Sequence, residues 1–169
     1  MAAFSAAYWI EKLQLSGHIE GGYYTRTYTA EHILPKAQLP AGFHGDRPVT
    51  TAIYFLLQKH QFSAMHRIAS DEIWHFYYGD PLEVFEIRPN GSLICHKLGA
   101  DPDNGTRFQC MVKAGSWFGA AVQEGAEYGL AGCTVAPGFD FDDFELANRN
   151  ILLNQFPQHK EIITKLTAP

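Results

Sequence analysis

The chain has 169 residues, of which 46% are hydrophobic and 18% are charged. This balance is typical of a folded globular protein and excludes a disordered chain. A chain of this length most simply forms one domain with a substantial core, so we expect a single domain over residues 1–169. The net charge is −5 and Lys and Arg form no cluster, so we expect no nucleic-acid partner and no anionic-membrane surface.

Three cysteines, Cys95, Cys110 and Cys133, are widely spaced and form no C-x-x-C pair. Their odd number and spacing indicate neither a disulfide framework nor a zinc site, and favour reduced structural thiols in a cytosolic protein. The N-terminal segment lacks the basic and long apolar regions of a signal peptide. No window approaches the roughly 18 apolar residues of a membrane span. We therefore predict a cytoplasmic protein with no membrane partner.

The first half of the chain begins with a helical pattern over residues 4–14. A strand is expected over residues 23–29, and the adjacent Gly21 and Gly22 before it predict a backbone that bends or passes close to another segment. Residues 29–49 hold three prolines and no clear period, which predicts a lid, an arm towards a partner or a mobile loop. Further strands are expected at residues 50–57, 62–67 and 72–78.

From residue 82 onward the pattern alternates between strands and turns. Asn90-Gly91 and Asn104-Gly105 are hairpin signals, because both residue types accept a positive φ. Short strands with regular turns favour a β-sandwich or barrel over βαβ units. The strands are expected at residues 82–87, 93–98, 107–112, 117–122 and 128–135.

The C-terminal segment is predicted to be helical over residues 142–154 and 158–166. Asp142 and Glu145 resemble a capping box at the start of the first helix. Together with Asp140 and Asp143 they also resemble calcium ligands, but no glycine stands where a calcium loop turns. We therefore favour helix capping over a calcium site.

The stretch richest in possible chemistry begins at His66. Strand alternation after it would place Glu72, Trp74, Phe76 and Tyr78 on one face. A carboxylate in line with three aromatic side chains is unusual on a strand. If that face points into a closed β-structure, the pattern predicts a pocket with an apolar wall and one ionisable group.

These motifs resemble the cupin superfamily, in which a His and an acidic residue precede a Gly-containing turn and a later strand. More narrowly, the chain resembles the small cupins of the Cupin_5 type. The resemblance implies a mainly β fold, the double-stranded β-helix or cupin jelly roll, with a ligand cavity inside the barrel. It also implies a homodimer. The helical patterns of the sequence further predict a short N-terminal helix and C-terminal helices outside this barrel. The segments that carry the resemblance are EGGYY (20–24), TAIYFLL (51–57), SDEIWHFYYGDPLEV (70–84), AGSWF (114–118) and GCTVAPGFDFDDFEL (132–146).

Metal-binding cupins carry three histidines and a glutamate, and His66 and Glu72 match two of these positions. The other two hold Ile68 and Phe118, which cannot bind a metal, whereas catalytic zinc sites typically keep about three protein ligands. His75 does not replace them, because strand parity turns it away from Glu72. We therefore expect no metal cofactor and keep a metal-dependent enzyme with a non-standard site as an alternative.

The remaining polar pair predicts acid–base chemistry. Glu72 is expected to orient the imidazole of His66 and raise its basicity, which makes these two the candidate catalytic residues. Arg26 is expected to anchor an anionic group of the ligand, or else to pair with an acidic residue inside the dimer. The predicted ligand-binding wall consists of aromatic side chains, namely Trp74, Phe76, Tyr78, Trp117, Phe118 and Tyr128.

We therefore predict a metal-independent cupin that binds a small aromatic or sugar-like metabolite and isomerises or epimerises it. In kind, such a site resembles that of the sugar-nucleotide epimerases with a cupin fold. One alternative is a non-catalytic binding or receptor protein for the same ligands. Another is that His66 and Glu72 only satisfy each other in a barrel without a ligand. A nucleophilic cysteine is disfavoured, and His32 and His44 are expected to be solvated.

Overall fold

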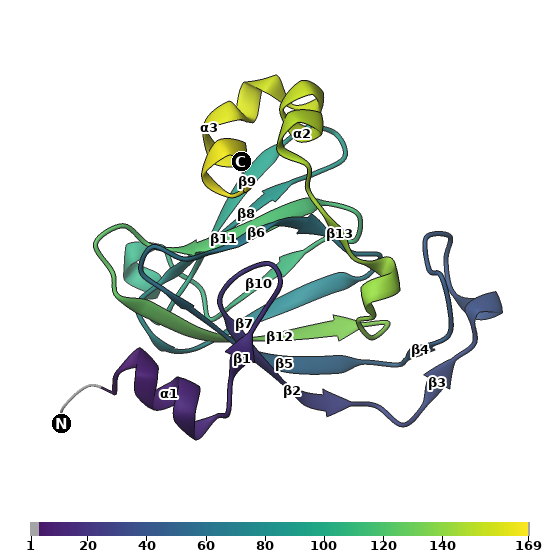
Figure 1. Cartoon of the computed structure of the whole chain (residues 1–169), viewed down its shortest axis with the longest axis horizontal. Coiled ribbons are helices and arrows are strands. Elements are labelled where there is room, and N and C mark those ends of the chain that lie inside the picture. The colour runs from purple at the N-terminus through teal and green to yellow at the C-terminus, as the bar shows by residue number, and fades with distance from the viewer. Residues whose placement is uncertain (1–3, 169) are drawn as a thin grey trace.

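The fold is a barrel made of two antiparallel sheets (Figure 1). The computed structural model describes residues 4–168. Short helices lie at both ends of the chain, so the predicted mainly β jelly roll with terminal helices is confirmed. None of the helices in residues 4–168 has the length and apolar character needed to cross a membrane.

The strands of the first sheet are, in spatial order, β1 (Ser16–Gly17), β2 (Tyr23–Thr29), β5 (Thr51–Gln58), β12 (Tyr128–Ala136), β7 (Asp71–Gly79) and β10 (Gln109–Val112). Those of the second are β13 (Glu145–Leu146), β6 (Phe62–Arg67), β11 (Trp117–Val122), β8 (Leu82–Ile87) and β9 (Leu93–Leu98). The α-helices are α1 (Ala6–Lys12), α2 (Arg149–Gln155) and α3 (Lys160–Lys165), and the 3₁₀ helices are η1 (Lys36–Gln38), η2 (Pro102–Asn104), η3 (Phe141–Asp143) and η4 (Pro157–His159).

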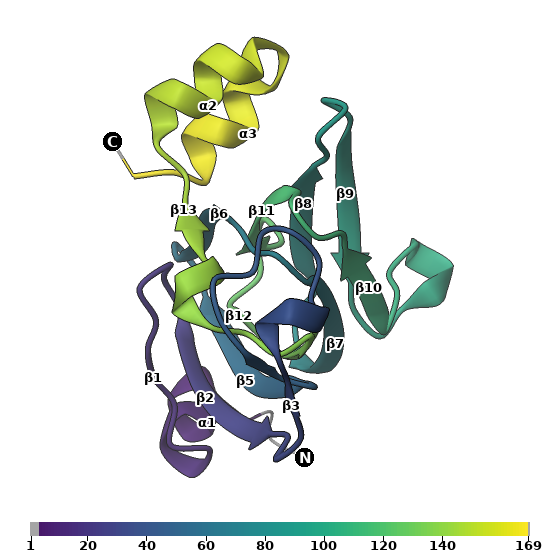
Figure 2. The ribbon, with the colours of Figure 1, turned by 90° about the vertical axis from the view of Figure 1, so that its right-hand side faces the viewer.

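Apolar side chains gather in three places, one inside the barrel and two outside it. The inner cluster contains Phe55, Trp74 and Phe118 between the two sheets. The α1 helix packs against the outer side of the first sheet. The pair α2 and α3 covers the outer side of the second sheet (Figure 2). Because the helices cover only outer faces, the space between the sheets is filled by side chains of the strands and of connecting segments, such as Ile68, Phe139 and Phe144.

The predicted helix over residues 142–154 is wrong in its first half. Helix α2 begins at Arg149, and the side chain of Asn148 caps it by accepting a hydrogen bond from the backbone N–H of Ile151. Residues 141–146 instead form η3 and then β13, which pairs with β6. Pairing with a sheet edge satisfies backbone groups that a local helix would otherwise have satisfied, so the tertiary contact overrides the local capping pattern.

The long connection over residues 30–49 is an ordered arm with its own two-stranded sheet, β3 (Ile33–Leu34) and β4 (Arg47–Pro48), which projects from the barrel (Figure 1). Arg47 is only 3% exposed. Its Nε donates a hydrogen bond to Oδ2 of Asp143 at 2.6 Å, and the exposed ring of His44 lies 3.1 Å from the same carboxylate. The arm is therefore fastened to η3.

The glycine pair before β2 is confirmed as a point of close approach. A Cβ added to Gly21 would lie 2.1 Å from the carbonyl oxygen of Phe62, and one added to Gly22 would lie 2.8 Å from that of Leu56. Both residues also have positive φ angles, 105° and 73°. The turn is therefore wedged between β5 and β6 and needs residues without a side chain.

We expect Gly21→Ala to lower the free energy of unfolding by about 1–3 kcal/mol, because it combines a left-handed backbone with a clash against backbone atoms. Gly17→Ala is the matched control: a Cβ there meets nothing within 4 Å, so we expect a change within about 0.5 kcal/mol. Urea unfolding monitored by fluorescence measures both. Equal stability of the two variants would contradict the close-approach argument.

Candidate functional site: a buried acid–base pocket

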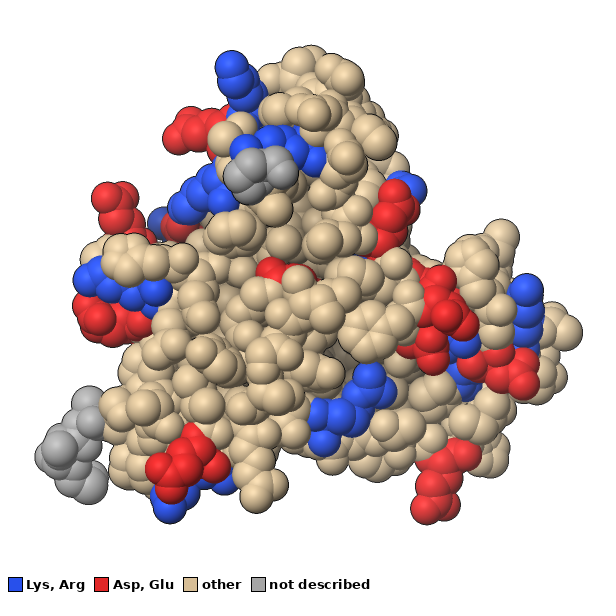
Figure 3. All heavy atoms as spheres, in the orientation of Figure 1, with Lys and Arg blue, Asp and Glu red and all other residues tan. Residues whose placement is uncertain are grey.

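A pocket opens between the inner face of the first sheet and β6. Its cavity volume is about 40 Å³, and the non-atom space reaches about 530 Å³ only when open solvent at the mouth is included. The face seen in Figure 3 is hollowed near its centre, with basic side-chain atoms beside the hollow. The pocket is lined by His18, Glu20, Tyr24, Arg26, Thr51, Ile53, Phe55, His66, Glu72, Cys133, Val135, Phe139 and Phe141.

His66 is held rigidly on β6. Its ring lies against the rings of Phe118 and Phe144, with centroid distances of 4.1 and 5.2 Å. Its Nδ1 lies 2.7 Å from the carbonyl oxygen of Ala64. Because a carbonyl oxygen can only accept, Nδ1 carries a hydrogen and donates it. In the neutral ring, Nε2 therefore has the free lone pair and faces the pocket, 3.4 Å from Oε2 of Glu20.

Glu20 is a central residue of the site that sequence reasoning missed. The Gly21-Gly22 turn folds its side chain inward, where it is 9% exposed. Oε1 accepts a hydrogen bond from the hydroxyl of Ser63 at 2.9 Å, and Oε2 lies 3.5 Å from Nδ1 of His18. The EGGYY segment supported only the family resemblance, and nothing in its local pattern indicates that the first residue faces a pocket.

Burial shifts the pKa values of all four titratable groups towards their neutral forms. It raises the pKa of Glu20 and the pKa of Glu72 from 4.5 to about 7 each. It also lowers the pKa values of His18 and His66 below their ordinary value, because a charged imidazole loses its hydration there. Carboxyl groups that titrate near neutral pH can both donate and accept protons at working pH.

Glu72 enters the pocket from β7, as predicted, but it is not hydrogen-bonded to His66 within residues 4–168. Cys133 on β12 lines the same pocket, and its thiol acts to lower the pKa of Glu72. Charge attraction still links the two predicted catalytic groups, since His66 acts to lower the pKa of Glu72. The orienting role expected of Glu72 is filled by the carbonyl group of Ala64.

Three of the predicted wall residues lie inside the barrel behind the pocket. Trp74 is 1% exposed and packs edge-on against Phe55 at 5.6 Å between ring centroids. Phe76 packs against the same core, and Phe118 supports the ring of His66. None of the three lines the cavity, so they shape the site from behind.

The other three predicted wall residues lie outside the barrel. Tyr78 and Tyr128 pack against α1, and Trp117 lies in the cluster under the C-terminal helices. The prediction for Tyr78 was wrong because a bulge in the pairing of β7 with β12 interrupts the alternation between Phe76 and Tyr78. Trp117 points outward because it precedes the inward Phe118 on the same strand. The aromatic side chains that do line the pocket are Tyr24, Phe55, Phe139 and Phe141.

Arg26 lies on β2 at the mouth of the pocket, as expected for a residue that receives an anion. Its guanidinium carbon lies 5.9 Å from the ring centre of Phe139. None of the ion pairs within residues 4–168 involves Arg26. The guanidinium is thus available to an anionic group, which it can bind by two parallel hydrogen bonds.

The positions at which other cupins bind metals do not fit a metal ion here. Ile68 is buried in the inner core, and Phe118 is packed against His66. Within residues 4–168, no group of three or more His, Cys, Asp or Glu side chains has a geometry that could hold a metal ion.

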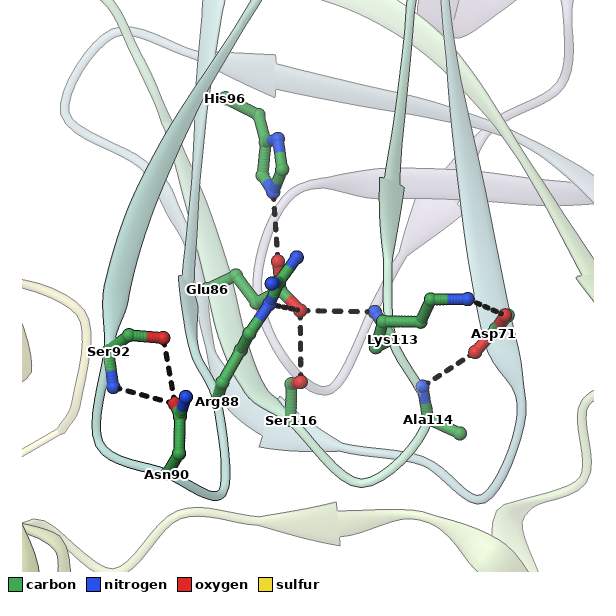
Figure 4. A network of polar contacts seen from close by, with 9 residues as sticks. All are labelled: Asp71, Glu86, Arg88, Asn90, Ser92, His96, Lys113, Ala114 and Ser116. Carbon is green, nitrogen blue, oxygen red and sulfur yellow. Dashed lines mark hydrogen bonds and ion pairs between the residues drawn. The ribbon is translucent and has the colours of Figure 1, made fainter.

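A third buried carboxylate, Glu86 on β8, belongs to a structural network (Figure 4). Oε2 lies 3.0 Å from Nε2 of His96, and Oε1 accepts from Ser116, from the backbone of Lys113 and from Arg88. Burial opposes ionisation, yet these hydrogen bonds hold the pKa of Glu86 below its ordinary value. Its acceptor sites are filled, so this network holds the turn before β11 to β8 and β9 and is not a candidate site.

The raised pKa of Glu20 predicts a pH-dependent stability. Between about pH 4.5 and pH 7 the native state binds more protons at Glu20 than the unfolded chain does, so the contribution of this group to the unfolding free energy falls as pH rises. We expect the stability of the wild type relative to Glu20→Gln to fall by roughly 1–3 kcal/mol between about pH 5 and pH 8. His18 and His66, whose lowered pKa values act in the opposite direction, are present in both proteins.

Urea unfolding of both proteins at the two pH values tests this expectation. Glu11→Gln, on the exposed side of α1, is the control and should follow the wild type. A pH dependence of Glu20→Gln parallel to that of the wild type would show that Glu20 is ionised throughout the range.

Comparison with known proteins shows which chains are similar to this one. The structure superposes on protein SO0799 from Shewanella oneidensis with a TM-score of 0.87 and 39% identity, covering 100% of this chain and 99% of that one. A hypothetical protein from Leishmania major gives a TM-score of 0.89 and 32% identity, covering 98% of this chain and 100% of that one. An uncharacterized protein of Saccharomyces cerevisiae, YML079W, is 27% identical over 142 residues, which are 79% of this chain and 71% of the yeast protein.

A cupin 2 domain-containing protein from Halorhodospira halophila shares the fold, with a TM-score of 0.53 and 12% identity over 91% of this chain and 88% of that one. Residues 7–147 match the family Cupin_5, described as "Cupin superfamily (DUF985)". These residues include all the lining residues of the pocket. The predicted resemblance is thereby confirmed, and the chain belongs to the Cupin_5 family of the cupin superfamily.

Proposed function

We propose that this cupin binds a small anionic metabolite in its barrel pocket and transfers a proton on it, with His66 as the acid–base group. One observation carries the proposal: Nε2 of His66 lies 3.4 Å from the carboxyl group of Glu20, in a pocket that also contains Glu72 and has Arg26 at its mouth. The charge at the mouth suits an anionic group, and the aromatic lining suits a planar or sugar-like body.

The arrangement favours proton transfer over simple binding. The hydrogen bond from Nδ1 of His66 to Ala64 leaves Nε2 to accept a proton, and the packed rings on either side keep its position constant. Two carboxyl groups with pKa values of about 7 provide a proton source and a proton acceptor beside it. These are the components of an isomerase or epimerase that moves a hydrogen on a carbon next to a carbonyl group.

We expect a ligand of this kind to raise the thermal unfolding temperature in a saturable way, since it binds the native state selectively. A panel of small carboxylates and sugar phosphates serves as the probe. Arg26→Ala should weaken binding about tenfold or more, through loss of a charge-assisted hydrogen bond. His66→Asn should keep binding and slow turnover by about 10²–10⁴-fold. Lys59→Ala, at an exposed ion pair with Glu127, is the control and should change neither.

The same assays decide between the possible roles of the pocket. Saturable binding without any product would indicate a carrier or receptor. Unchanged binding by Arg26→Ala would show that Arg26 does not bind the anionic group of the ligand. We also propose that no metal is required, because two of the four positions used by other cupins are apolar here. Treatment with EDTA should then leave ligand binding unchanged, whereas a loss of binding restored by a divalent cation would favour a metal-dependent site.

We also propose that the chain forms a homodimer, as the family resemblance implies. The outer faces of β7 and β10 carry exposed apolar side chains at Ile73, Tyr77 and Met111. Ile73 and Met111 are paired across the two strands. The polar ring of His75, between Ile73 and Tyr77 on β7, is already bonded to Thr134 and Gln109, so this side chain presents no unsatisfied polar group to a second copy.

We expect the wild type to be a dimer in size-exclusion chromatography with light scattering. Met111→Glu places a charge in this face and should shift the protein towards the monomer. Ile151→Glu, at a more exposed apolar position on α2, is the control and should remain a dimer. A wild-type monomer would refute the proposal. If Met111→Glu remains a dimer, the dimer interface does not include this face.

The cytoplasmic location predicted from the sequence likewise remains a proposal. It is supported by the three free thiols of Cys95, Cys110 and Cys133, which are typical of a reducing compartment.

A further inference from the structure

The position of one proton in the pocket follows from its hydrogen bonds. Nδ1 of His66 donates to the carbonyl group of Ala64, so Nε2 of the neutral ring has a lone pair. Nδ1 of His18 accepts a hydrogen bond from the backbone N–H of Glu20 at 3.3 Å, so it also has a lone pair there. Oε2 of Glu20 thus faces two nitrogen lone pairs, at 3.4 and 3.5 Å.

An ionised carboxylate in that place would face two lone pairs and have one hydrogen-bond donor, the hydroxyl of Ser63, which serves Oε1. A proton on Oε2 removes the conflict, because the carboxylic acid can then donate to Nε2 of His66. The alternative, a charged His66 beside an ionised Glu20, requires two charges in a buried site. Burial raises the pKa of Glu20 to about 7 and lowers that of His66, which agrees with the neutral arrangement.

We propose that Glu20 is the catalytic proton donor of this site and that the substrate is a small oxo carboxylate, whose carbonyl oxygen receives that proton. This inference rests on the proposed function and specifies its substrate class. Arg26 at the mouth binds the carboxylate, and the aromatic side chains of Phe139, which lies next to Arg26, and Phe141 line the same pocket. A planar enol intermediate suits such a lining.

The step balances without an oxidant, a reductant or a metal. The C–H bond next to the carbonyl group breaks, its proton passes to Nε2 of His66, and its electron pair forms the C=C bond. The carbonyl oxygen takes the proton of Glu20, which becomes a carboxylate that accepts from Ser63. Reversal of the step, after the His66 proton has exchanged with water, replaces the substrate hydrogen by one from solvent.

The protonation state can be tested on the free protein. Infrared spectra near neutral pH should contain a carboxylic-acid C=O band that Glu20→Gln diminishes and Glu11→Gln, on the exposed face of α1, leaves unchanged. If Glu20→Gln leaves the band unchanged, Glu20 is ionised and the inference is overturned.

The catalytic role is tested with 2-oxobutyrate as the probe, by following the exchange of its C3 hydrogens in D₂O with proton NMR. We expect the wild type to accelerate exchange over buffer, and Glu20→Gln to slow it by about 10²–10⁴-fold while the thermal shift by 2-oxobutyrate persists. If Glu20→Gln does not fold, Glu20→Asp keeps the acid but withdraws it by one methylene, and a smaller loss of rate is expected.

The outcomes separate the inference from the function on which it rests. An unchanged exchange rate in a folded Glu20→Gln overturns the role of Glu20 and leaves the proposed function intact. If other anions of the panel bind but 2-oxobutyrate neither binds nor exchanges, the substrate class is wrong and the proposed function stands. If no anion binds, both the proposed function and the inference about Glu20 are refuted.

Discussion

Glu20 has its carboxyl group closed off from bulk water between the rings of His18 and His66, and the chemistry of the pocket depends on this confinement. An ionised carboxylate in such a place loses its hydration, which costs several kcal/mol unless donors replace the water. Only Ser63 donates to it by its side chain within residues 4–168. The folded chain therefore favours neutral forms of these groups, and neutral acids and bases in contact are what proton transfer requires.

The contrast with Glu86 shows that burial alone does not decide protonation. Both residues are glutamates with little exposure, yet their pKa values move in opposite directions. Glu86 accepts hydrogen bonds from four neighbouring groups (Figure 4), so its charge is solvated by the protein. The number of hydrogen-bond donors that the fold directs at each carboxylate therefore decides the direction of its pKa shift: downward for Glu86 and upward for Glu20.

The wall of the pocket depends on a distant part of the chain. Phe139 and Phe141 line the cavity on the segment that includes η3. That segment is tied to the projecting arm by the buried pair of Arg47 and Asp143. Phe144, three residues beyond Phe141, supports the ring of His66. The arm therefore contributes to the site indirectly, because it holds in place the segment that carries the aromatic side chains of the pocket.

The sequence was sufficient for most of the strands and for the family. The strands predicted at residues 23–29, 62–67, 82–87, 93–98 and 117–122 match the structure residue for residue. Alternation and turn residues are local signals that the barrel preserves. Where tertiary pairing competed with a local pattern, the pairing prevailed: β13 replaced the predicted start of a helix, and a bulge turned Tyr78 outward.

Of the site, the sequence by itself identified His66, Glu72 and Arg26, because a strand pattern and the family motifs point to them. It did not identify His18 or Glu20, whose approach to His66 depends on a glycine turn wedged between β5 and β6. Nor could it show that Trp74 and Phe118 lie behind the pocket while Phe139 and Phe141 face it. Which side chains share a cavity is decided by how the two sheets and the segment after β12 come together, and those contacts join residues far apart in the sequence.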